Sequence, residues 1–333
     1  MKVLVTGANG FLGRPTVQAF LHRGHGVRAL VRPAAAVDGL WPDAVEVARA
    51  DLRSGGDLQA AVGGTDAVIH LAAGTSGDES DMFAATVVGT ERLLTAMAAT
   101  STRRLILASS FAVYDWDATA GRLTESSPLT MDLEGRGGYT AAKVWQERVA
   151  RRMSAEHGFQ LTVLRPGVVW GRGNEYPPGI AQKVGPLHLV FGLAARLPLT
   201  YAENCAEAFV LATERDGTIG ETLNVVDDAG TSTARFVQEH LRRTGAGGVV
   251  MAVPYKVAEL VIRAVSSTSA RVFGRPGHLP SIMVPPRFVA RFKALDYDNT
   301  KLRDLAGWEP RYSLDEALAR TYERSAGSVA SWS

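Results

Sequence analysis

The stretch Thr6-Gly7-Ala8-Asn9-Gly10-Phe11-Leu12-Gly13 follows the apolar run Val3-Leu4-Val5 and precedes a predicted helix. Gly7 allows a tight turn at the end of a strand, Gly10 lets the backbone approach a pyrophosphate, and Gly13 lets the helix pack against the sheet. The N–H groups and the positive dipole end of such a helix attract phosphate. The stretch therefore predicts a dinucleotide-binding turn, although any tight strand-to-helix turn also requires glycine.

Short apolar runs without alternation recur along the chain, which is typical of parallel strands covered on both faces. The predicted strands are residues 2–5, 27–31, 45–47, 67–69, 105–107 and 161–164, and the main helices are 14–21, 83–100 and 139–157. This alternation predicts an α/β fold, a doubly wound parallel sheet of the Rossmann type with a smaller interleaved substrate-binding region.

The pattern changes after residue 166, where residues 171–198 are rich in glycine and proline. A helix at 204–213 and a strand at 222–226 return to the sheet pattern, and helices separated by proline-rich loops are expected from residue 231. We expect the apolar stretch 257–265 to be a lid helix over the substrate cleft, rather than a membrane contact. The predicted division is a dinucleotide-binding domain of residues 1–166 and 201–228, and a substrate-binding region of 167–200 and 229–333.

The overall composition argues against several classes of partner. The chain has 36 Lys and Arg against 34 Asp and Glu, so no charge excess points to nucleic acid or to a membrane. The one cysteine, Cys205, suits a reducing compartment, and the seven histidines show no metal-ligand spacing. With no secretory signal and no apolar run of about 18 residues, the sequence predicts a cytoplasmic protein that binds a small-molecule substrate and no metal.

Tyr139 and Lys143 stand at positions i and i+4 at the start of a predicted helix, so both side chains lie on one face. A neighbouring ammonium favours phenolate and lowers the pKa of a tyrosine, which can then exchange a proton with a substrate oxygen near neutral pH. The alternative is an ordinary aromatic–lysine pair on an exposed helix.

Ser109 and Ser110 follow the predicted strand 105–107, at the carboxyl edge of the sheet. The hydroxyl of Ser110 could hydrogen-bond a carbonyl oxygen and hold it beside Tyr139; the alternative is a pair of serines that only cap a strand end. The glycine turn, this serine and the Tyr-x-x-x-Lys helix, in that order, are more specific than any one of them.

With these motifs the chain resembles the extended short-chain dehydrogenase/reductase family, also called the NAD-dependent epimerase/dehydratase family, over nearly its whole length. The segments that carry the resemblance are Thr6 to Gly13, Asp51-Leu52-Arg53, His70-Leu71-Ala72-Ala73, Ser109 to Tyr114, Tyr139 to Lys143, Leu164-Arg165-Pro166, Asn224 to Asp228 and Gly307 to Pro310. The resemblance implies that Ser110, Tyr139 and Lys143 are the catalytic residues and that Lys143 also holds the nicotinamide ribose. It further implies that Asp51 and Leu52 contact the adenine and that Leu71, Ala72 and Ala73 run along the cofactor.

Departures from the family pattern narrow the expected activity. Phe111-Ala112 follows Ser110 where dehydratases and decarboxylases carry acidic residues, so both activities are disfavoured. Arg165-Pro166-Gly167 lacks the asparagine that meets the diphosphate of nucleotide sugars in many members. Thr86 also replaces an asparagine of the family.

The end of the second predicted strand bears on the choice of cofactor. An NAD enzyme is expected to carry Asp or Glu there, but this chain has Arg32 and its next acidic residue is Asp38. Arg32 could pair with a 2′-phosphate, or it could be a solvated strand-end arginine. We therefore expect NADP rather than NAD, with NAD possible.

The sequence thus predicts an NAD(P)-dependent oxidoreductase that transfers hydride between nicotinamide and a secondary alcohol or ketone carbon, with Tyr139 as acid and base and ketone reduction as the favoured direction. The first alternative is a sugar or sugar-nucleotide epimerase that retains NAD, and the second is a non-catalytic dinucleotide-sensing regulator. Four arginines lie where substrate is expected, and one or two of them could bind an anionic group; they are Arg271, Arg275, Arg287 and Arg291. By family analogy, helices 83–100 and 139–157 would pack into a homodimer.

Overall fold

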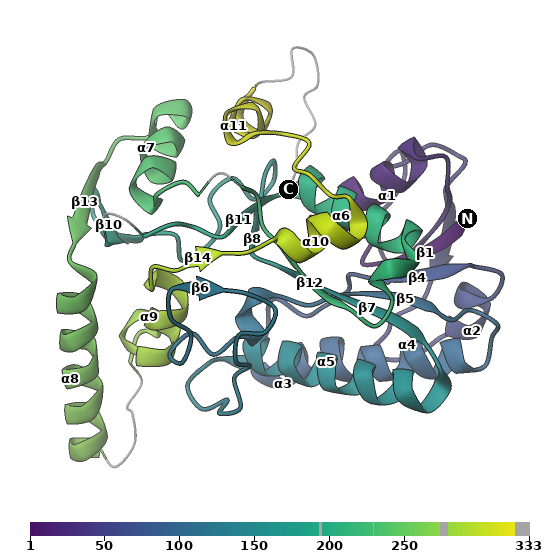
Figure 1. Ribbon diagram of the computed structural model, residues 1–333, viewed down its shortest axis with the longest axis horizontal. Helices are drawn as coiled ribbons and strands as arrows, with labels where there is room; N and C mark the ends of the chain where they lie inside the picture. The colour runs from purple at the N-terminus through teal and green to yellow at the C-terminus, as the bar shows by residue number, and fades with distance from the viewer. Residues whose placement is uncertain (193–194, 229, 274–278, 324–333) are drawn as a thin grey trace.

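The computed structural model describes residues 1–192, 195–228, 230–273 and 279–323. Its centre is a seven-stranded, wholly parallel sheet with strand order β12-β7-β5-β4-β1-β2-β3 (Figure 1). The strands are β1 (Lys2–Thr6), β2 (Gly26–Val31), β3 (Glu46–Arg49), β4 (Ala67–His70), β5 (Arg104–Ala108), β7 (Gln160–Pro166) and β12 (Thr222–Val225). The predicted fold class is confirmed.

Helices cover both faces of this sheet, which explains why the strands are apolar without alternation. In β1, Val3 and Val5 pack against one helical layer, whereas Leu4 packs against the other, and all three are fully buried. The first layer contains α1 (Gly13–His22), α6 (Ala202–Glu214) and α10 (Thr300–Ala306), and the second contains α2 (Leu58–Val62), α4 (Gly89–Ala98) and α5 (Gly138–His157).

The predicted helix 83–100 begins earlier and is interrupted. It consists of α3 (Glu79–Phe83), a π-helical turn η1 (Ala84–Val88) and α4. The hydroxyl of Thr86 in this turn accepts a hydrogen bond from the Gly74 N–H at 2.9 Å. Thr86 therefore anchors the loop after β4, a role that its position in the sequence did not reveal.

The rest of the chain forms smaller sheets beside the carboxyl ends of the main strands (Figure 1). One sheet has the order β13-β10-β9, and β8 pairs with β11 and β6 with β14. These strands are β6 (Arg122–Leu123), β8 (Val168–Trp170), β9 (Gln182–Val184), β10 (Leu187–Phe191), β11 (Leu199–Tyr201), β13 (Val249–Val253) and β14 (Asp296–Tyr297). The expectation of helices alone after residue 231 is wrong at β13 and β14, because Val-Val-Met-Ala-Val pairs in parallel with β10.

The remaining helices flank these small sheets. They are α7 (Thr233–Thr244), α8 (Tyr255–Phe273), α9 (Pro285–Phe292) and α11 (Leu314–Tyr322), with the short 3₁₀ turns η2 (Phe111–Val113), η3 (Asp216–Thr218) and η4 (Ser281–Met283). Figure 1 shows α8 along one side of the molecule, with α9 between it and the main sheet.

The helix α8 is not the expected lid over the cleft. Ile262 is the buried residue of the stretch 257–265, whereas Val257, Leu260 and Val261 are 57%, 70% and 54% exposed. The apolar side chains face solvent because α9 fills the space between α8 and the sheet. None of the helices in the described ranges combines the length and the apolarity needed to cross a bilayer.

Candidate active site

The glycine turn after β1 has the geometry that the sequence predicts. Gly7 has a φ of 66°, and a Cβ there would lie 3.0 Å from the backbone nitrogen of Ala72. At Gly13 a Cβ would collide with the carbonyl oxygens of Gly7 and Ala8, so α1 can begin here only with glycine. The backbone of the turn therefore packs directly against the backbone at Ala72 and at the start of α1. The exposed backbone of Gly10 remains open to a ligand.

A cavity of about 580 Å³ adjoins this turn at the carboxyl ends of β1, β2 and β4. Of the predicted cofactor residues, those in its wall are Gly7, Asn9, Gly10, Arg32, Asp51, Leu52, Ala72 and Ala73. Phe11, Leu12, Gly13 and Leu71 do not line it. The volume, the exposed glycine backbone and the helix N-terminus suit a dinucleotide with its pyrophosphate at the turn.

The charged side chains in the wall of this cavity are Arg32, Asp51, Arg53 and Asp81. Arg53 binds Asp51 at 3.2 Å, and this bond, helped by the charge of Arg32, lowers the pKa of Asp51. Arg32 is exposed and makes no ion pair within the described ranges. A cationic side chain is thus available beside the end of β2, where an acidic residue would be expected for NAD.

Of the predicted catalytic residues, Ser110 and Tyr139 line a second cavity of about 510 Å³. Ser110 follows β5, and its Oγ accepts the N–H of Ala112 at 3.1 Å, which caps η2. Tyr139 lies in the first turn of α5 and lines the same cavity. Lys143 follows one turn later but is buried behind the cavity wall.

Lys143 is held by acceptors of its own chain. Its Nζ donates to the carbonyl oxygen of Ala108 at 2.8 Å and to Oε1 of Gln146 at 2.9 Å, and it lies 6.0 Å from the centre of the Tyr139 ring. Burial lowers the pKa of Lys143 to about 8. Because an ammonium has three N–H groups, one remains for a further acceptor.

The expected lowering of the Tyr139 pKa by Lys143 is wrong for this structure. Burial raises the pKa of Tyr139, and the interaction with the Ser110 hydroxyl acts in the opposite direction without overcoming it. The ammonium of Lys143 points instead to Ala108 and Gln146. The phenol is therefore protonated at neutral pH, ready to donate its proton.

A buried polar chain fixes Lys143 from the other side. Gln146 donates to the hydroxyl of Thr90 at 2.9 Å, and His70 bridges Thr90 at 2.8 Å and Thr6 at 2.7 Å. Burial, and then the charge of Lys143, lowers the pKa of His70 to about 3, so the imidazole is neutral. The chain ties β1, β4, α4 and α5 together beneath the predicted catalytic residues.

A buried carboxylate that the sequence motifs do not single out, Glu147, lies one helical turn beyond Lys143. Arg165 binds its carboxylate through Nε at 2.9 Å and a terminal nitrogen at 2.7 Å, and the Ser109 hydroxyl donates to it as well. Burial raises the pKa of Glu147, but the bonds and charge of Arg165 bring it below its ordinary value. The spacing of Tyr139, Lys143 and Glu147 at i, i+4 and i+8 was a signal that could have found it.

The second cavity is mainly apolar, with a few charged side chains. Its apolar wall is formed by Met82, Phe111, Ala112, Trp116, Val168, Pro178, Ile180, Leu197, Pro198, Pro286, Ala290 and Tyr297. Glu79, Arg136, Arg287 and Arg291 supply the charges. Two of the four arginines expected to face substrate therefore do so, whereas Arg271 lies exposed on α8 and Arg275 falls outside the described residues.

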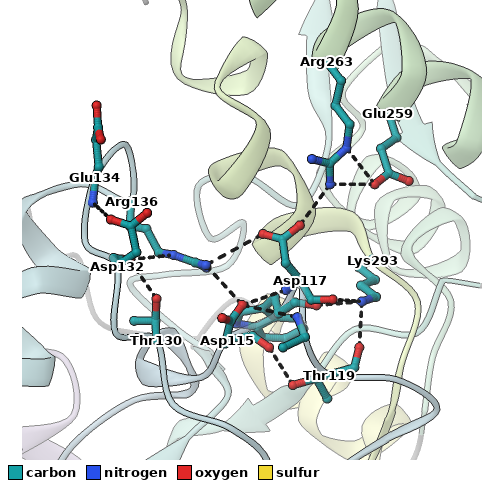
Figure 2. A network of polar contacts seen from close by, with 12 residues as sticks. Asp115, Asp117, Thr119, Thr130, Asp132, Glu134, Arg136, Glu259, Arg263 and Lys293 are labelled. Atoms are coloured by element: carbon teal, nitrogen blue, oxygen red, sulfur yellow. Dashed lines mark hydrogen bonds and ion pairs between the residues drawn. The ribbon is translucent and has the colours of Figure 1, made fainter. Parts of the chain in front are cut away.

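The three arginines of this cavity differ in their partners. Arg136 pairs with Asp115 at 3.1 Å and Asp117 at 3.7 Å, as Figure 2 shows. Arg287 donates through Nε to the carbonyl oxygen of Gly135, and neither Arg287 nor Arg291 makes an ion pair in the part of the chain that the structure describes. Burial and the charge of Arg287 lower the pKa of Arg291, as expected for neighbouring cations without an anion.

The polar contacts in Figure 2 join this cavity to the outer helices. Arg263 on α8 binds Asp117 at 2.9 Å, so Asp117 lies between Arg263 and Arg136. Lys293, which follows α9, donates to the carbonyl oxygens of Trp116, Asp117 and Thr119. Within the described ranges, no three His, Cys, Asp or Glu side chains gather into a metal site.

Comparison with known proteins agrees with this geometry. The model of the NAD dependent epimerase/dehydratase family matches residues 3–225. A 3 beta-hydroxysteroid dehydrogenase/Delta 5-->4-isomerase of Mycobacterium tuberculosis is 29% identical over 95% of this chain and 88% of that protein. A 2-alkyl-3-oxoalkanoate reductase of Stenotrophomonas maltophilia is 29% identical over 98% of this chain and 100% of that protein. The UDP-glucuronic acid 4-epimerase of Bacillus cereus in complex with NAD shares the fold, with a TM-score of 0.72 and 21% identity over 97% and 96% of the two chains.

The chain belongs to the NAD dependent epimerase/dehydratase family. It is an NAD(P)-dependent enzyme, and the two curated relatives named above are a dehydrogenase/isomerase and a reductase, which agrees with the predicted oxidoreductase.

Proposed function

We propose that this enzyme reduces a ketone, with NADPH as the hydride donor. The observation that carries the proposal is the juxtaposition of Ser110 and Tyr139 in the wall of an apolar cavity, with Lys143 buried one helical turn away. When bound, the nicotinamide supplies a hydride to the carbonyl carbon. The oxygen then gains a proton, so the reaction yields a secondary alcohol.

Each of the three side chains has a distinct task in this proposal. The protonated phenol of Tyr139 donates its proton to the carbonyl oxygen, which suits a pKa raised by burial. The Ser110 hydroxyl donates a hydrogen bond to the same oxygen and orients it. The remaining N–H of Lys143 would hold the nicotinamide ribose.

The preference for NADP rests on Arg32. Its unpaired guanidinium at the end of β2 suits a 2′-phosphate. We expect Arg32→Ala to raise the KM for NADPH about tenfold or more, the value of one lost charge-assisted bond, and to leave the KM for NADH unchanged. An equal effect on both cofactors would contradict this role.

We further propose that the ketone carries an apolar body and an anionic group. The apolar wall supports the first part, and the pair Arg287 and Arg291 supports the second. A relative is named as a reductase of 2-alkyl-3-oxoalkanoates, which combine both features. Gly167 argues against a nucleotide sugar, because the carbonyl of Pro198 occupies the place where the side chain of an asparagine would begin.

The decisive experiment measures NADPH oxidation with a long-chain 3-oxo acid, its methyl ester and a nucleotide sugar. We expect turnover of the 3-oxo acid, and a KM for the acid alone that rises when Arg287 and Arg291 are replaced by glutamine. Tyr139→Phe should lower kcat by at least about a hundredfold, because it removes the general acid. Turnover of the nucleotide sugar with NAD retained through purification would instead favour the epimerase alternative.

A regulator that only senses the dinucleotide is the remaining alternative. It predicts cofactor binding without turnover, and a cellular phenotype that survives Tyr139→Phe. The complete set of Ser110, Tyr139 and Lys143 supports catalysis over sensing. We also propose that the enzyme acts as a homodimer in the cytoplasm, where reducing conditions suit its single buried cysteine, Cys205.

A further inference from the structure

The helix α8 carries an apolar stripe that nothing in the described chain covers. Its members recur at helical spacing on the side away from α9, and they are Val257 (57% exposed), Leu260 (70%), Val261 (54%), Val265 (39%) and Val272 (67%). The preceding strand β13 adds Val249 and Met251, which are 60% and 43% exposed. Figure 1 shows β13 running into α8 along one margin of the molecule, so the two form a continuous edge. Soluble proteins rarely expose contiguous apolar surface without a partner.

The charged side chains of α8 are mostly basic. They are Lys256, Arg263 and Arg271 against the single acidic residue Glu259, and Arg263 also binds Asp117 at 2.9 Å. Glu259 is itself bound to Lys256 at 3.2 Å and to Arg263 at 3.0 Å. Lys256 remains 86% exposed and Arg271 is also exposed, so the helix presents positive charge beside its apolar stripe.

We propose that this face of α8 docks the protein on a lipid bilayer that contains anionic phospholipids. An amphipathic helix with an apolar stripe and flanking lysine or arginine lies in the interface with its apolar side chains among the acyl chains and its cations at the headgroups. The net charge of the whole chain does not reveal this basic helix, because acidic residues elsewhere in the sequence offset its charge.

The charge pattern favours a bilayer over a second copy of the chain. In a two-fold dimer the same patch meets itself, so Lys256 and Arg271 would approach the same cations of the partner without an exposed acidic residue on α8 to oppose them. An anionic bilayer supplies the missing negative charge over a broad plane. The positive charge of α8 therefore favours an anionic bilayer over a second copy of the chain as the partner of this face.

The docking helix is mechanically linked to the substrate cavity. Tyr255 of α8 stacks on Phe288 of α9, and Arg287 and Arg291 of α9 line the cavity. Docking through α8 would hold the cavity close to the bilayer, which is where an apolar substrate partitions. The lipid-binding proposal rests on the exposed side chains of α8 and β13 and does not require the proposed reaction.

The test is flotation of the full-length protein with vesicles of phosphatidylcholine alone, or of phosphatidylcholine mixed with phosphatidylglycerol. We expect the protein to float with the mixed vesicles and to stay behind with the neutral ones. The double change Val257→Glu and Leu260→Glu should weaken flotation by at least about tenfold, because it buries charge in place of apolar side chains. Arg271→Gln should weaken it about fivefold, the value of one basic residue at an anionic surface.

Matched controls separate docking from folding. Val47→Glu and Met131→Glu also add a carboxylate at exposed apolar positions, 43% and 76% exposed, but they lie on β3 and before α5, and flotation should not change. Every variant should keep the wild-type unfolding midpoint. The proposal is overturned if wild type does not float with the mixed vesicles, or floats equally with both. It is also overturned if light scattering shows a dimer that the α8 double variant alone converts to monomer.

Discussion

Arg165 and Glu147 form a fully buried ion pair behind the predicted catalytic residues, with side chains 3% and 5% exposed. The ring of Tyr114 lies 4.7 Å from the Arg165 guanidinium, and the Tyr114 hydroxyl donates to Asn224 at 2.7 Å. Arg165 has Glu147 as its ion-pair partner, whereas Glu147 also meets the partly exposed Arg151 at 3.4 Å. The buried guanidinium therefore depends on this one carboxylate. The pair fixes β7 against α5 at the level of Ser109.

Removing one partner should therefore be costly. We expect Glu147→Gln to lower the free energy of unfolding by about 3–5 kcal/mol, because the buried guanidinium loses its counter-charge. The measurement is urea denaturation. Asp296→Asn is the matched control, since its pair with Arg196 is exposed at the surface and away from α4 and α5, and it should contribute about 0–1 kcal/mol. Equal losses in the two variants would contradict the assignment.

Because of His70, the free energy of unfolding should fall as the pH is lowered. The folded protein holds its pKa at about 3, against an ordinary value of 6.5. Below pH 6.5 the unfolded chain takes up a proton that the folded one rejects, so this contribution is present above pH 6.5 and is lost as the pH falls toward 3. The slope approaches about 1.4 kcal/mol per pH unit.

Denaturation of wild type and His70→Gln between these pH values measures this effect. We expect the variant to lose the His70 part of the slope, while the exposed His157→Gln behaves as wild type. A slope that is identical in all three proteins would show that His70 is not responsible.

At the scale of elements, the junction of β1 with α1 depends on Gly13. A Cβ at this position collides with two backbone carbonyl oxygens, which cannot move aside as a side chain can. We expect Gly13→Ala to destabilise the protein by about 1–3 kcal/mol, the usual cost of overpacking, and to abolish binding of NADPH, measured by calorimetry. Gly247→Ala is the control, because a Cβ there meets open space.

The elements show where sequence reasoning succeeds and where it stops. Strands such as β4 and β5 are predictable because burial on both faces leaves a local apolar signature. The strand β13 could not be predicted in this way, because it is a strand only through its pairing with β10, which lies about 60 residues earlier in the chain. The exposed face of α8 was misread for the same reason, since an apolar helix does not reveal which neighbour, if any, covers it.

The candidate site divides in a similar way. Ser110 and Tyr139, which motif and spacing single out, line one cavity, and their catalytic roles stay a prediction. The direction in which Lys143 points, toward Ala108 and Gln146, depends on atoms from β5 and α5 together and has no sequence signature. The predicted boundaries of the two domains remain a prediction.

At the scale of the whole molecule, the proposed homodimer involves the outer faces of α4 and α5. Trp145 of α5 is 41% exposed with the guanidinium of Arg148 4.9 Å from its ring, which suits an interface. We expect light scattering to give twice the monomer mass, and Trp145→Glu to give the monomer. The α8 variant Leu260→Glu should stay dimeric. A monomeric wild type would refute the proposed assembly.

The position of Asp117 between Arg136 and Arg263 has one last consequence. The Asp117 carboxylate pairs with Arg136 in the wall of the substrate cavity and with Arg263 on α8. A ligand that binds either guanidinium therefore changes the electrostatic potential at the other. Thermodynamic reciprocity then requires that any factor by which α8 binding alters substrate affinity also applies to the reverse effect. Binding of substrate in the cavity and attachment at α8 would then be thermodynamically coupled, so a measurement of either one would report on the other.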